Sequence, residues 1–552
     1  MGPLTADLPK PMLRVRGKPV LERHVEQLAA AGVDTIWMNL SHHGQVIRDY
    51  FGGGERWGLR IRYSDEETLL GTAGALKRLA REFSQGDFFV VYGDNLLFCD
   101  YQALAASHTP GSLLTLALFH LDEVAASGIA EMGDDGRILR FLEKPLPGEQ
   151  FSHWANAGVY AASPELLPLL PEGPSDFGHD VIPSLLVGGR LLRGVVLPGP
   201  VEGIDTPEQL ARADVLGIAV VGAGRMGTRR ASLARRSANC RLLWVIDNQL
   251  ERARRTAEPA GEPQVSTDWS AALGDPRVDA VAVCTPNHLL APIARAALEA
   301  GKHALVEKPA ARHSTELEPL VRLAAQRRLV FKAGLNYRFH PAIRQARERL
   351  LQGEIGRPLH LIARHGHGGR EGLTQEWRAD ADQAGGGPLL DQGTHLIDLF
   401  RWFTGQEFST AQAATATEFW PIQPLEDAAF CLLHTVSGIP CSLQVSLLEW
   451  KNRFQFEVVG ERGALLVEGL GGSYGPEQLT ITRRPPQFGV PQQERIAFEN
   501  PEQCWAEEWA EFVSAICQRR PPDGDGWAAL AALRAVEACY RAAREARTVE
   551  CR

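Results

Sequence analysis

The 552-residue sequence has no long apolar run, no basic excess and no paired cysteines. Without an uninterrupted apolar stretch of about eighteen residues, a helical membrane span is not expected, and the N-terminus lacks the charged-then-apolar order of a signal peptide. The 58 basic and 67 acidic residues give a formal net charge of −9, which argues against a nucleic-acid or anionic-membrane partner. The nine cysteines show no CxxC pair or metal-ligand spacing, which indicates reduced thiols and a cytoplasmic location.

A glycine-rich turn in the middle of the chain predicts a dinucleotide-binding domain. The apolar run at residues 216–221 has the length of a buried strand and breaks into Gly222-x-Gly224-x-x-Gly227, after which a helical pattern begins. In such a turn Gly222 allows the sharp bend, Gly224 lets the backbone approach a pyrophosphate, and Gly227 lets the helix pack against the strand. A glycine-rich turn in another kind of α/β domain is the alternative interpretation.

An acidic residue at the end of the next strand supports the dinucleotide-binding interpretation. The apolar strand predicted at residues 241–246 ends in Asp247, where a carboxylate would bind the ribose 2′-hydroxyl. We therefore expect a Rossmann domain over residues 215–335, with Arg225 and Met226 contributing to the cofactor site. The cofactor is expected to be NAD rather than NADP, because Asp247 would repel a 2′-phosphate.

The residues before this domain alternate between helical patterns and short apolar strands. Helices are predicted at residues 20–31 and 45–51 and strands at residues 35–39 and 59–63. This alternation predicts a mostly parallel sheet covered by helices, so the whole chain is expected to be of the α/β class. A further strand runs into Gly93-Asp94, which places a carboxylate at the C-terminal end of a strand, a usual position for a magnesium ligand beside a triphosphate.

Several ordered motifs in residues 1–214 resemble those of the sugar-phosphate nucleotidyltransferases, of the glucose-1-phosphate thymidylyl and mannose-1-phosphate guanylyl type. The motifs are Leu8-Pro-Lys-Pro-Met-Leu13, Leu70-Gly-Thr-Ala-Gly-Ala-Leu76, Gly93-Asp94, Glu143-Lys-Pro145, Asn156-Ala-Gly-Val-Tyr160 and Asp205-Thr-Pro-Glu208. The resemblance implies a Rossmannoid nucleotidyltransferase-like domain that binds a nucleoside triphosphate, a sugar phosphate or a nucleotide sugar, with Mg²⁺.

The same resemblance implies a role for individual residues of this first domain. Those implied to contact the nucleotide or the sugar phosphate are Lys10, Gly71, Thr72, Ala73, Asp94, Glu143, Lys144, Asn156 and Gly158. Asp94 and Asp205 are the implied metal ligands, with Glu202 as the alternative to Asp205. The family opens with a strand and a glycine-rich phosphate loop upstream of a segment like Pro3-Leu4-Thr5. We therefore expect the natural start to lie upstream of Met1, and nucleotidyl transfer by the sequence as it stands to be impaired.

Motifs in residues 216–552 resemble the glucose–fructose oxidoreductase and inositol dehydrogenase family. Besides the glycine-rich turn they are Thr285-Pro-Asn-His288, Glu307-Lys-Pro309 and the segment from Gly385 to Asp398 that contains Asp391-Gln-Gly-Thr-His395. The resemblance implies cofactor contacts from Thr285, Pro286, Asn287, His288, Glu307 and Lys308. It also implies a C-terminal α/β domain, residues 336–552, with a large open antiparallel sheet through which we expect the chain to form a homo-oligomer.

Three residues of this region predict chemistry at a sugar hydroxyl. Asp391 and His395 are spaced i, i+4, so on a helix the carboxylate would orient the imidazole as a proton acceptor. Lys308, at a predicted strand end, would polarise the reacting oxygen. A helix-surface ion pair is the alternative for Asp391 and His395. The pair His365-x-His367 lacks a third metal ligand at suitable spacing, and residues 337–340 are interpreted as lining a sugar pocket or capping the domain. Trp505 is interpreted as a core or interface residue.

These patterns together predict a bifunctional nucleotide-sugar enzyme, in which a nucleotidyltransferase-like half precedes an NAD-dependent sugar dehydrogenase. One alternative is a dehydrogenase whose first half only binds a nucleotide sugar. Another is a non-catalytic sensor of dinucleotide and sugar, although a sensor has no need of Lys308, Asp391 and His395 as a proton relay.

Overall fold

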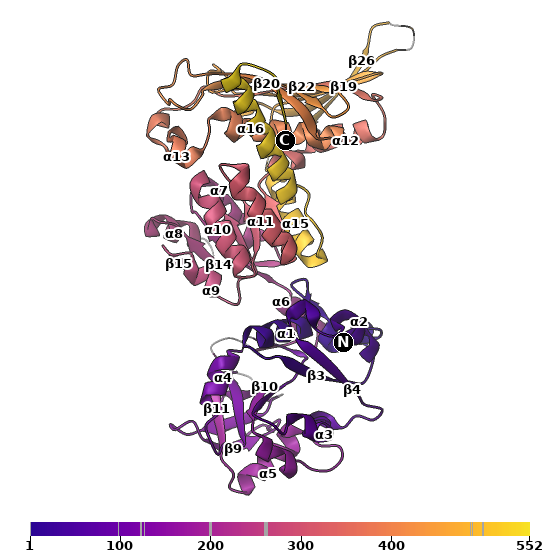
Figure 1. The fold of residues 1–552 in the computed structure, drawn as a ribbon, viewed down its shortest axis with the longest axis vertical. Helices are drawn as coiled ribbons and strands as arrows, with labels where there is room; N and C mark the ends of the chain where they lie inside the picture. The colour runs from indigo at the N-terminus through magenta and orange to yellow at the C-terminus, as the bar shows by residue number, and fades with distance from the viewer. Residues whose placement is uncertain are drawn as a thin grey trace. The chain divides into compact units, whose positions relative to one another are not determined.

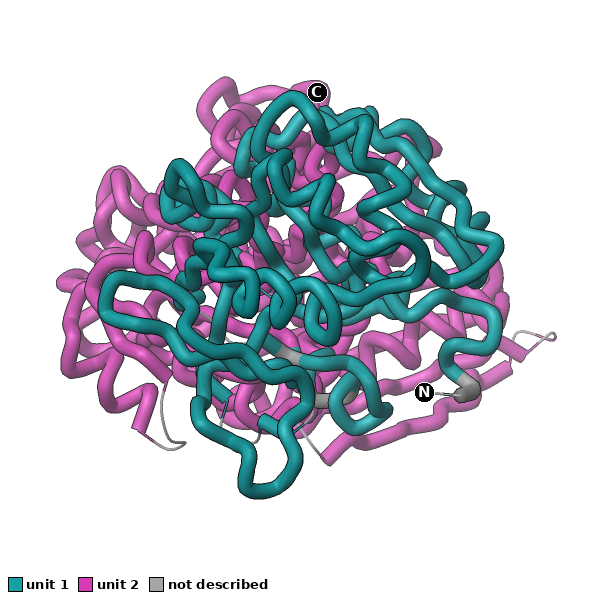
Figure 2. Tube along the Cα trace, turned by 90° about the horizontal axis from the view of Figure 1, so that it is seen from below, with its two compact units in different colours: residues 1–215 teal, residues 216–552 magenta. Residues whose placement is uncertain are grey.

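The chain forms two compact units, residues 1–215 and 216–552, which Figure 2 colours separately. The computed structural model describes residues 2–97, 99–121, 124–125, 127–197, 201–258, 263–485, 487, 489–499 and 502–551. Within these ranges no helix is long and apolar enough to cross a membrane.

The first unit contains one six-stranded sheet and three two-stranded pairs. Its sheet has the order β11-β7-β10-β8-β9, with β5 added beside β10. The strands are β1 (Arg14–Val15), β2 (Lys18–Pro19), β3 (Thr35–Leu40), β4 (Arg60–Asp65), β5 (Phe88–Val91), β6 (Asn95–Leu97), β7 (Leu114–His120), β8 (Ile129–Met132), β9 (Ile138–Leu142), β10 (Trp154–Ala162), β11 (Leu192–Val196) and β12 (Val201–Gly203). The helices are α1 (Val20–Ala30), α2 (Gly44–Phe51), α3 (Gly71–Arg78), α4 (Tyr101–Ser107), α5 (Ile182–Val187) and α6 (Pro207–Ala213).

The helices and strands predicted in this unit are observed, but the prediction of a mostly parallel sheet was wrong. Parallel pairing joins β3 to β4 and β11 to β7, whereas β10 runs antiparallel to β5, β7 and β8, and β8 runs antiparallel to β9. The β8–β9 connection explains part of the difference, because such a short link can only join antiparallel neighbours. Alternating hydrophobicity in single strands does not reveal which strand each one pairs with.

The second unit begins with the predicted Rossmann domain, a six-stranded parallel sheet in the order β15-β14-β13-β16-β17-β18. Its strands are β13 (Leu216–Val221), β14 (Cys240–Ile246), β15 (Gln264–Ser266), β16 (Ala280–Val283), β17 (His303–Val306) and β18 (Phe331–Ala333). Its helices are α7 (Arg225–Arg236), α8 (Leu250–Ala257), α9 (Ser270–Gly274), α10 (Asn287–Glu299) and α11 (Ser314–Gln326). Since strand side chains alternate, Ile218 and Val220 pack with α7 and α8 while Ala219 and Val221 pack with α10 and α11.

A nine-stranded sheet forms the C-terminal part of the second unit (Figure 1). It is open and antiparallel except for the parallel pair β19–β22, as predicted for a large open sheet. Its strands are β19 (Pro358–Gly366), β20 (Phe408–Ala416), β21 (Ala428–Thr435), β22 (Pro440–Ser446), β23 (Arg453–Gly460), β24 (Gly463–Glu468), β25 (Glu477–Arg483), β26 (Gln492–Phe498) and β27 (Val549–Glu550). The helices of this part are α12 (Pro341–Leu351), α13 (Ala381–Ala384), α14 (Thr394–Thr404), α15 (Gln503–Gln518) and α16 (Gly526–Glu545), of which α14 and α16 bury apolar residues against the sheet.

Helix α15 returns from the C-terminal part to complete the Rossmann core. Its residues Trp509, Phe512 and Ile516 pack in the same cluster as α7 and one face of β13. A buried ion network reinforces this packing, because the fully buried guanidinium of Arg230 donates to Glu307 at 2.7 Å and to Glu508 of α15 at 2.7 Å. A buried charge must be paired in this way to avoid a large desolvation cost. The Rossmann core therefore uses residues from both ends of the second unit.

Candidate functional site

The glycine-rich turn between β13 and α7 has the geometry that its sequence predicts. Gly222 has a φ of +94°, and a Cβ there would lie 2.5 Å from the carbonyl oxygen of Cys284. A Cβ at Gly227 would lie 1.6 Å from the carbonyl oxygen of Gly222, so the first turn of α7 cannot carry a side chain at this position. Gly224 faces open space, which leaves room for an anion at the N-terminus of the helix.

The carboxylate of Asp247 closes the far side of this turn. Its Oδ2 accepts a hydrogen bond from the backbone N–H of Ala223 at 2.8 Å, and its Oδ1 accepts one from Gln249 at 2.9 Å. These bonds fix the carboxylate at the end of β14 beside the glycine turn. Arg252 lies 3.8 Å from Oδ1, so the local environment of Asp247 contains one cation.

A pocket of about 840 Å³ extends from this turn to the edge of the C-terminal sheet. Nearly all the cofactor-contact and catalytic residues predicted for this unit line it: Gly222, Gly224, Arg225, Met226, Asp247, Thr285, Pro286, Asn287, His288, Glu307, Lys308, Asp391 and His395. Gly227 does not line the pocket, because its role lies in helix packing. The amide of Asn287 donates to the carbonyl of Ala384 at 2.8 Å, so this residue also joins the Rossmann domain to α13.

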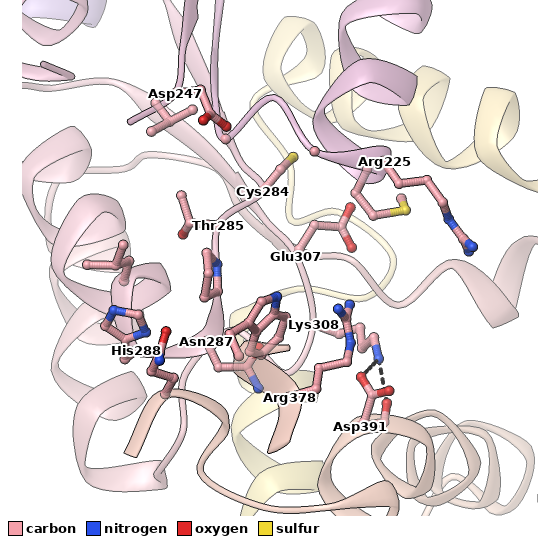
Figure 3. A pocket seen from close by; sticks show the side chains of 18 of the residues that line it. Arg225, Asp247, Cys284, Thr285, Asn287, His288, Glu307, Lys308, Arg378 and Asp391 are labelled. Atoms are coloured by element: carbon pink, nitrogen blue, oxygen red, sulfur yellow. Dashed lines mark hydrogen bonds and ion pairs between the residues drawn. The ribbon is translucent and has the colours of Figure 1, made fainter. Parts of the chain in front are cut away.

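Asp391 bonds to Lys308 rather than to His395. The ammonium of Lys308, just after β17, donates to the Asp391 carboxylate and, at 2.6 Å, to the Asp391 carbonyl (Figure 3). Among the described hydrogen bonds none joins Asp391 to His395, so the orientation of the imidazole by the carboxylate was predicted wrongly. The reason is local geometry: Asp391 lies in a π-helical turn, Leu389–Gly393, and only His395 lies in the regular helix α14.

The turn that carries Asp391 is held from behind by a buried glutamate. Glu426 accepts hydrogen bonds from the backbone N–H groups of Gly387 at 3.1 Å and Leu389 at 2.9 Å, and from the Tyr540 hydroxyl at 2.8 Å. A Cβ at Gly387 would lie 2.2 Å from the carbonyl oxygen of Glu426. The glycine-rich segment before Asp391 is therefore required, because neighbouring backbone and side-chain atoms leave no room for a larger residue.

The charges in this pocket are strongly coupled. Burial favours the neutral acid, but the charges of Lys308 and Arg378 outweigh it and hold the pKa of Asp391 well below its usual range. Figure 3 shows the Arg378 guanidinium on the same side of the pocket as Lys308. Burial and the charge of Lys308 hold the pKa of His395 well below its ordinary value. His395, only 5% exposed, is therefore a neutral imidazole at neutral pH.

Several pocket residues were not anticipated, and all of them except Gln392 lie outside the motifs of the second unit. They are Trp377, Arg378, Gln392, Asn452, Ser473, Tyr474 and Trp505. Trp505, interpreted from the sequence as a core or interface residue, is half-buried and lines this pocket. His365 and His367 also line it, and among the described residues no group of three or more metal-ligating side chains is found here or elsewhere. Tyr337 lines the pocket, as one of its two interpretations predicted.

Buried polar atoms in the pocket fit a dinucleotide and a polar substrate. Thr285 Oγ1 and His288 Nδ1, at the start of α10, and His395 Nδ1, in α14, are buried without a hydrogen-bond partner. Buried polar groups normally find partners, and each one left alone costs about 1–3 kcal/mol. Together with the open Gly224 turn and Asp247, these atoms fit the polar groups of NAD along one wall and of a hydroxylated substrate at the other end.

In the first unit, two of the predicted carboxylates converge on one lysine. Lys10 donates to Asp94 Oδ2 at 2.9 Å and also to Asp205 Oδ1, although these residues lie far apart in the sequence. Burial opposes the charged form of Lys10, but its bonds to Asp205 and Asp94 outweigh this and raise its pKa. The donor set, two carboxylates with oxygens turned to one cation, fits a hard divalent ion such as Mg²⁺.

The other predicted residues of the first unit form a second group around Tyr92. The Tyr92 hydroxyl donates to Thr72 at 3.2 Å, the Tyr160 hydroxyl donates to Tyr92 at 3.4 Å, and the Asn156 amide donates to Tyr160 at 2.7 Å. Gly158 has a φ of +71° and leaves no space for a Cβ beside the Tyr92 ring. The motifs at residues 70–76 and 156–160 are thus joined by one chain of hydroxyl and amide groups.

The structure also places the other residues implied to contact the nucleotide or the sugar phosphate. Gly71, Thr72 and Ala73 begin helix α3, and a Cβ at Gly71 would lie 2.5 Å from the carbonyl oxygen of Ser175. The glycine is therefore needed for packing against the chain itself. Glu143 fits against Gly128 and Gly178, where burial raises its pKa. Lys144 follows it with a φ of +49°.

Comparison with known families places each unit. The Nucleotidyl transferase family matches residues 1–199, the Oxidoreductase family, NAD-binding Rossmann fold, matches residues 216–335, and the GFO/IDH/MocA C-terminal domain matches residues 343–466. The chain is thus a fusion of a nucleotidyltransferase-type unit and an NAD-binding Rossmann-fold oxidoreductase region. More particularly, it carries an N-terminal nucleotidyl transferase domain and a C-terminal GFO/IDH/MocA oxidoreductase region.

Individual relatives align with one unit at a time. A UTP–glucose-1-phosphate uridylyltransferase of Synechocystis sp. is 34% identical over 202 residues, 34% of this chain and 52% of the relative. A levoglucosan dehydrogenase of Pseudarthrobacter phenanthrenivorans is 33% identical over 244 residues, 40% of this chain and 59% of the relative. A mannose-1-phosphate guanylyltransferase of Mycobacterium tuberculosis is 32% identical over 217 residues, 38% and 59% respectively. The chain therefore spans between half and three fifths of the length of these curated relatives.

Solved structures align with most of the chain beyond the first unit. A levoglucosan dehydrogenase in complex with NADH superposes with a TM-score of 0.56 at 23% identity, covering 61% of this chain and 99% of that one, which shows the fold. An aldose–aldose oxidoreductase of Caulobacter crescentus complexed with glycerol superposes with a TM-score of 0.55 at 26% identity and the same coverage.

Proposed function

We propose that the chain is a bifunctional sugar enzyme, in which the second unit oxidises or reduces a hydroxyl of a sugar or nucleotide sugar with NAD. The observation that carries the proposal is the meeting of Lys308, Asp391 and neutral His395 in the pocket that starts at the Gly222–Gly227 turn. Similarity to a levoglucosan dehydrogenase supports a sugar as the substrate.

The residues of the pocket account for the proton and the charge in this reaction. When bound, NAD supplies the acceptor of the hydride. His395, neutral and buried, accepts the proton of the substrate hydroxyl while hydride leaves the carbon that carries this hydroxyl. Lys308 donates toward the oxygen as it becomes a carbonyl, and Asp391 holds the ammonium in place and balances its charge. In the reverse direction His395 returns the proton.

For the first unit we propose nucleotidyl transfer to a sugar 1-phosphate. Asp94 and Asp205 would hold Mg²⁺, which would neutralise charge on the phosphates of a nucleoside triphosphate. Lys10 lies between the two carboxylates and would turn its ammonium to a phosphate oxygen. The alternative is that this unit only binds a nucleotide sugar and catalyses no reaction.

Two assays on the whole chain separate these possibilities. NADH formation is followed with levoglucosan, free hexoses and nucleotide hexoses, and pyrophosphate release is followed with nucleoside triphosphates, sugar 1-phosphates and Mg²⁺. NADH formation together with pyrophosphate release, even at the low rate expected of an impaired nucleotidyltransferase, supports the bifunctional enzyme. NADH formation with no pyrophosphate release at all supports the dehydrogenase with a binding module. Tight dinucleotide binding with neither signal would refute catalysis and favour a non-catalytic sensor.

We also propose that the outer face of the nine-stranded sheet pairs with a second copy of the chain. Ile362 of β19, 44% exposed, and Phe430 of β21, 52% exposed, lie on this face with β22 between them. Exposed apolar side chains on one face of a sheet can contribute to an interaction surface. The double variant I362K/F430K should be monomeric by light scattering if the wild type is dimeric. V187K, at an exposed valine of the first unit, is the matched control. A dimer in both variants would contradict the proposal.

A further inference from the structure

The imidazole of His395 lies flat against the ring of Tyr337. The ring centroids are 4.0 Å apart and the planes differ by 6°. Tyr337 belongs to the short 3₁₀ turn Asn336–Phe339 after β18, and His395 lies in the first turn of α14, so the contact joins the segment that follows the Rossmann domain to the helix that carries the proton acceptor.

Little else in the pocket fixes the plane of this imidazole. His395 Nδ1 is buried without a hydrogen-bond partner, and the carboxylate of Asp391 bonds to Lys308. A histidine that accepts a proton usually has its second nitrogen held by a carboxylate or a carbonyl. Here no described hydrogen bond does so, and a ring that could rotate would lose its alignment with the substrate.

Tyr337 is itself held on several sides. Its hydroxyl bonds to His365 Nε2 at 3.1 Å, and burial and the neighbouring His367 lower the pKa of His365 to about 3, so this imidazole is neutral and can accept. Phe454 and His340 meet the Tyr337 ring edge-on, with centroids 5.6 Å away in each case. The tyrosine ring is therefore a rigid platform.

We propose that Tyr337 is the positioning residue of this site, and that its ring, rather than a carboxylate, sets the orientation of His395. The stack does two things. It keeps the neutral imidazole in one plane, and it presents an aromatic face to the imidazolium that forms when His395 takes a proton, a favourable cation–π contact. The functional part of this inference rests on the proposed oxidoreductase activity, whereas the structural part does not.

Proton NMR of the histidine ring signals tests the structural part without any turnover. The Cε1 proton of His395, identified as the signal missing from H395Q, should be displaced upfield by the Tyr337 ring. The displacement should persist in Y337F, which keeps the ring, and disappear in Y337L. An unchanged His395 signal in Y337L would overturn the inference, whatever the enzyme does.

Kinetics with the substrate found by NADH formation test the functional part. Misplacement of a reacting group by about 1 Å can cost about 100-fold, so Y337L should lower kcat by about 10- to 100-fold with little change in KM. Y337F should restore most of the loss. The matched control is Y474L, which removes the ring stacked on His365, with centroids 5.0 Å apart, and leaves the ring against His395. It should have the smaller effect.

The outcomes of this comparison are distinct. Equal losses in Y337F and Y337L, or in Y474L and Y337L, would show that the stack on His395 does not set the rate. Thermal melts show whether each variant is folded, and Y337M, which keeps bulk without a flat ring, replaces Y337L if the latter is not. Absence of sugar-dependent NADH formation in the wild type would refute the proposed function, while the NMR comparison would still decide whether Tyr337 holds the imidazole.

Discussion

Each unit places a lysine–aspartate pair at its candidate site, and the two pairs are similarly exposed. The side chains of Lys308 and Asp391 are 21% and 35% exposed, and those of Lys10 and Asp94 are 22% and 42% exposed. They differ in what surrounds them. Lys308 and Arg378 both act on Asp391 beside a buried imidazole, which leaves one net positive charge, whereas Lys10 meets a second carboxylate, Asp205, which leaves one net negative charge. Local charge count, more than burial, therefore separates a site suited to proton transfer from one suited to a cation.

His395 is the proposed proton acceptor of the second site, so its removal should have the largest effect. H395A deletes the proton acceptor and should lower turnover by about 10²- to 10⁴-fold. Because H395A also removes a buried ring that stacks on Tyr337, the melting temperature should fall somewhat, but the loss of stability should be far too small to account for the loss of turnover. Turnover and a thermal melt are measured together. Turnover equal to that of the wild type would contradict the assignment of His395 as the proton acceptor. A collapsed melting temperature with a matching loss of activity would indicate that the residue is structural.

The buried pair formed by His340 and Glu477 should make the stability of the second unit depend on pH. Burial opposes the charge on His340, but its contacts with Cys504 and Glu477 raise its pKa to about 9. Because the pKa of His340 is higher in the folded than in the unfolded state, protonation of His340 stabilises the fold. This contribution to the free energy of unfolding is about 3 kcal/mol, is fully present below the unfolded-state pKa of about 6.5, and is lost as the pH rises through about 9.

Differential scanning calorimetry between pH 6 and 10 measures this contribution. E477Q should lower the melting temperature of the second unit at pH 6 and flatten its fall toward pH 10. The transition of the first unit serves as the internal reference. A wild-type transition that does not change between pH 6 and 10 would contradict the prediction.

The net negative charge of the first site can be removed by one substitution. D94N leaves Lys10 with a single carboxylate partner, so a divalent cation loses both a ligand and its electrostatic attraction. Mg²⁺-dependent pyrophosphate release should fall by about 100-fold, while NAD-dependent turnover stays at the wild-type level. Equal losses in both activities would mean that the substitution acts through the fold.

The choice of cofactor is a smaller effect. Asp247, fixed by two backbone N–H groups, should favour the ribose hydroxyls of NAD over a 2′-phosphate by at least about tenfold, or about 1.4 kcal/mol. Fluorescence titration of both reduced cofactors measures it. D247N should narrow the preference, and tighter NADPH than NADH binding by the wild type would refute the assignment.

The smallest expected effect tests the charge balance of the second site. Burial and the charge of Lys308 lower the pKa of His395, and the negative charge of Asp391 partly offsets this lowering. D391N should therefore lower the pKa of His395 further. The acid limb of the kcat profile should then move to lower pH, with a loss of less than about tenfold near neutrality. A shift of the acid limb to higher pH would show that the carboxylate acts on another group.

The sequence was sufficient for the features that depend on short stretches of chain. The glycine turn and Asp247 were predictable because strand, turn, helix and acid follow one another, and the carboxylate bonds only 24 residues back. Contacts that depend on tertiary packing were not predictable from the sequence. Lys308 and Asp391 lie 83 residues apart, and a π-helical turn changes the direction in which Asp391 points. The antiparallel pairing in the first unit and the Tyr337–His395 stack likewise depend on tertiary contacts that no spacing encodes.

The buried guanidinium of Arg230 has a consequence for how the second unit could be divided or reused. Its two carboxylates are Glu307, just after strand β17, and Glu508 of helix α15, so a fragment cut after β18 would keep the cation and lose Glu508. Removing one partner of a buried ion pair costs about 3–5 kcal/mol, and the apolar residues of α15 would be lost as well. The nucleotide-binding module is thus continuous in space but interrupted in sequence. It can be exchanged between proteins only together with helix α15.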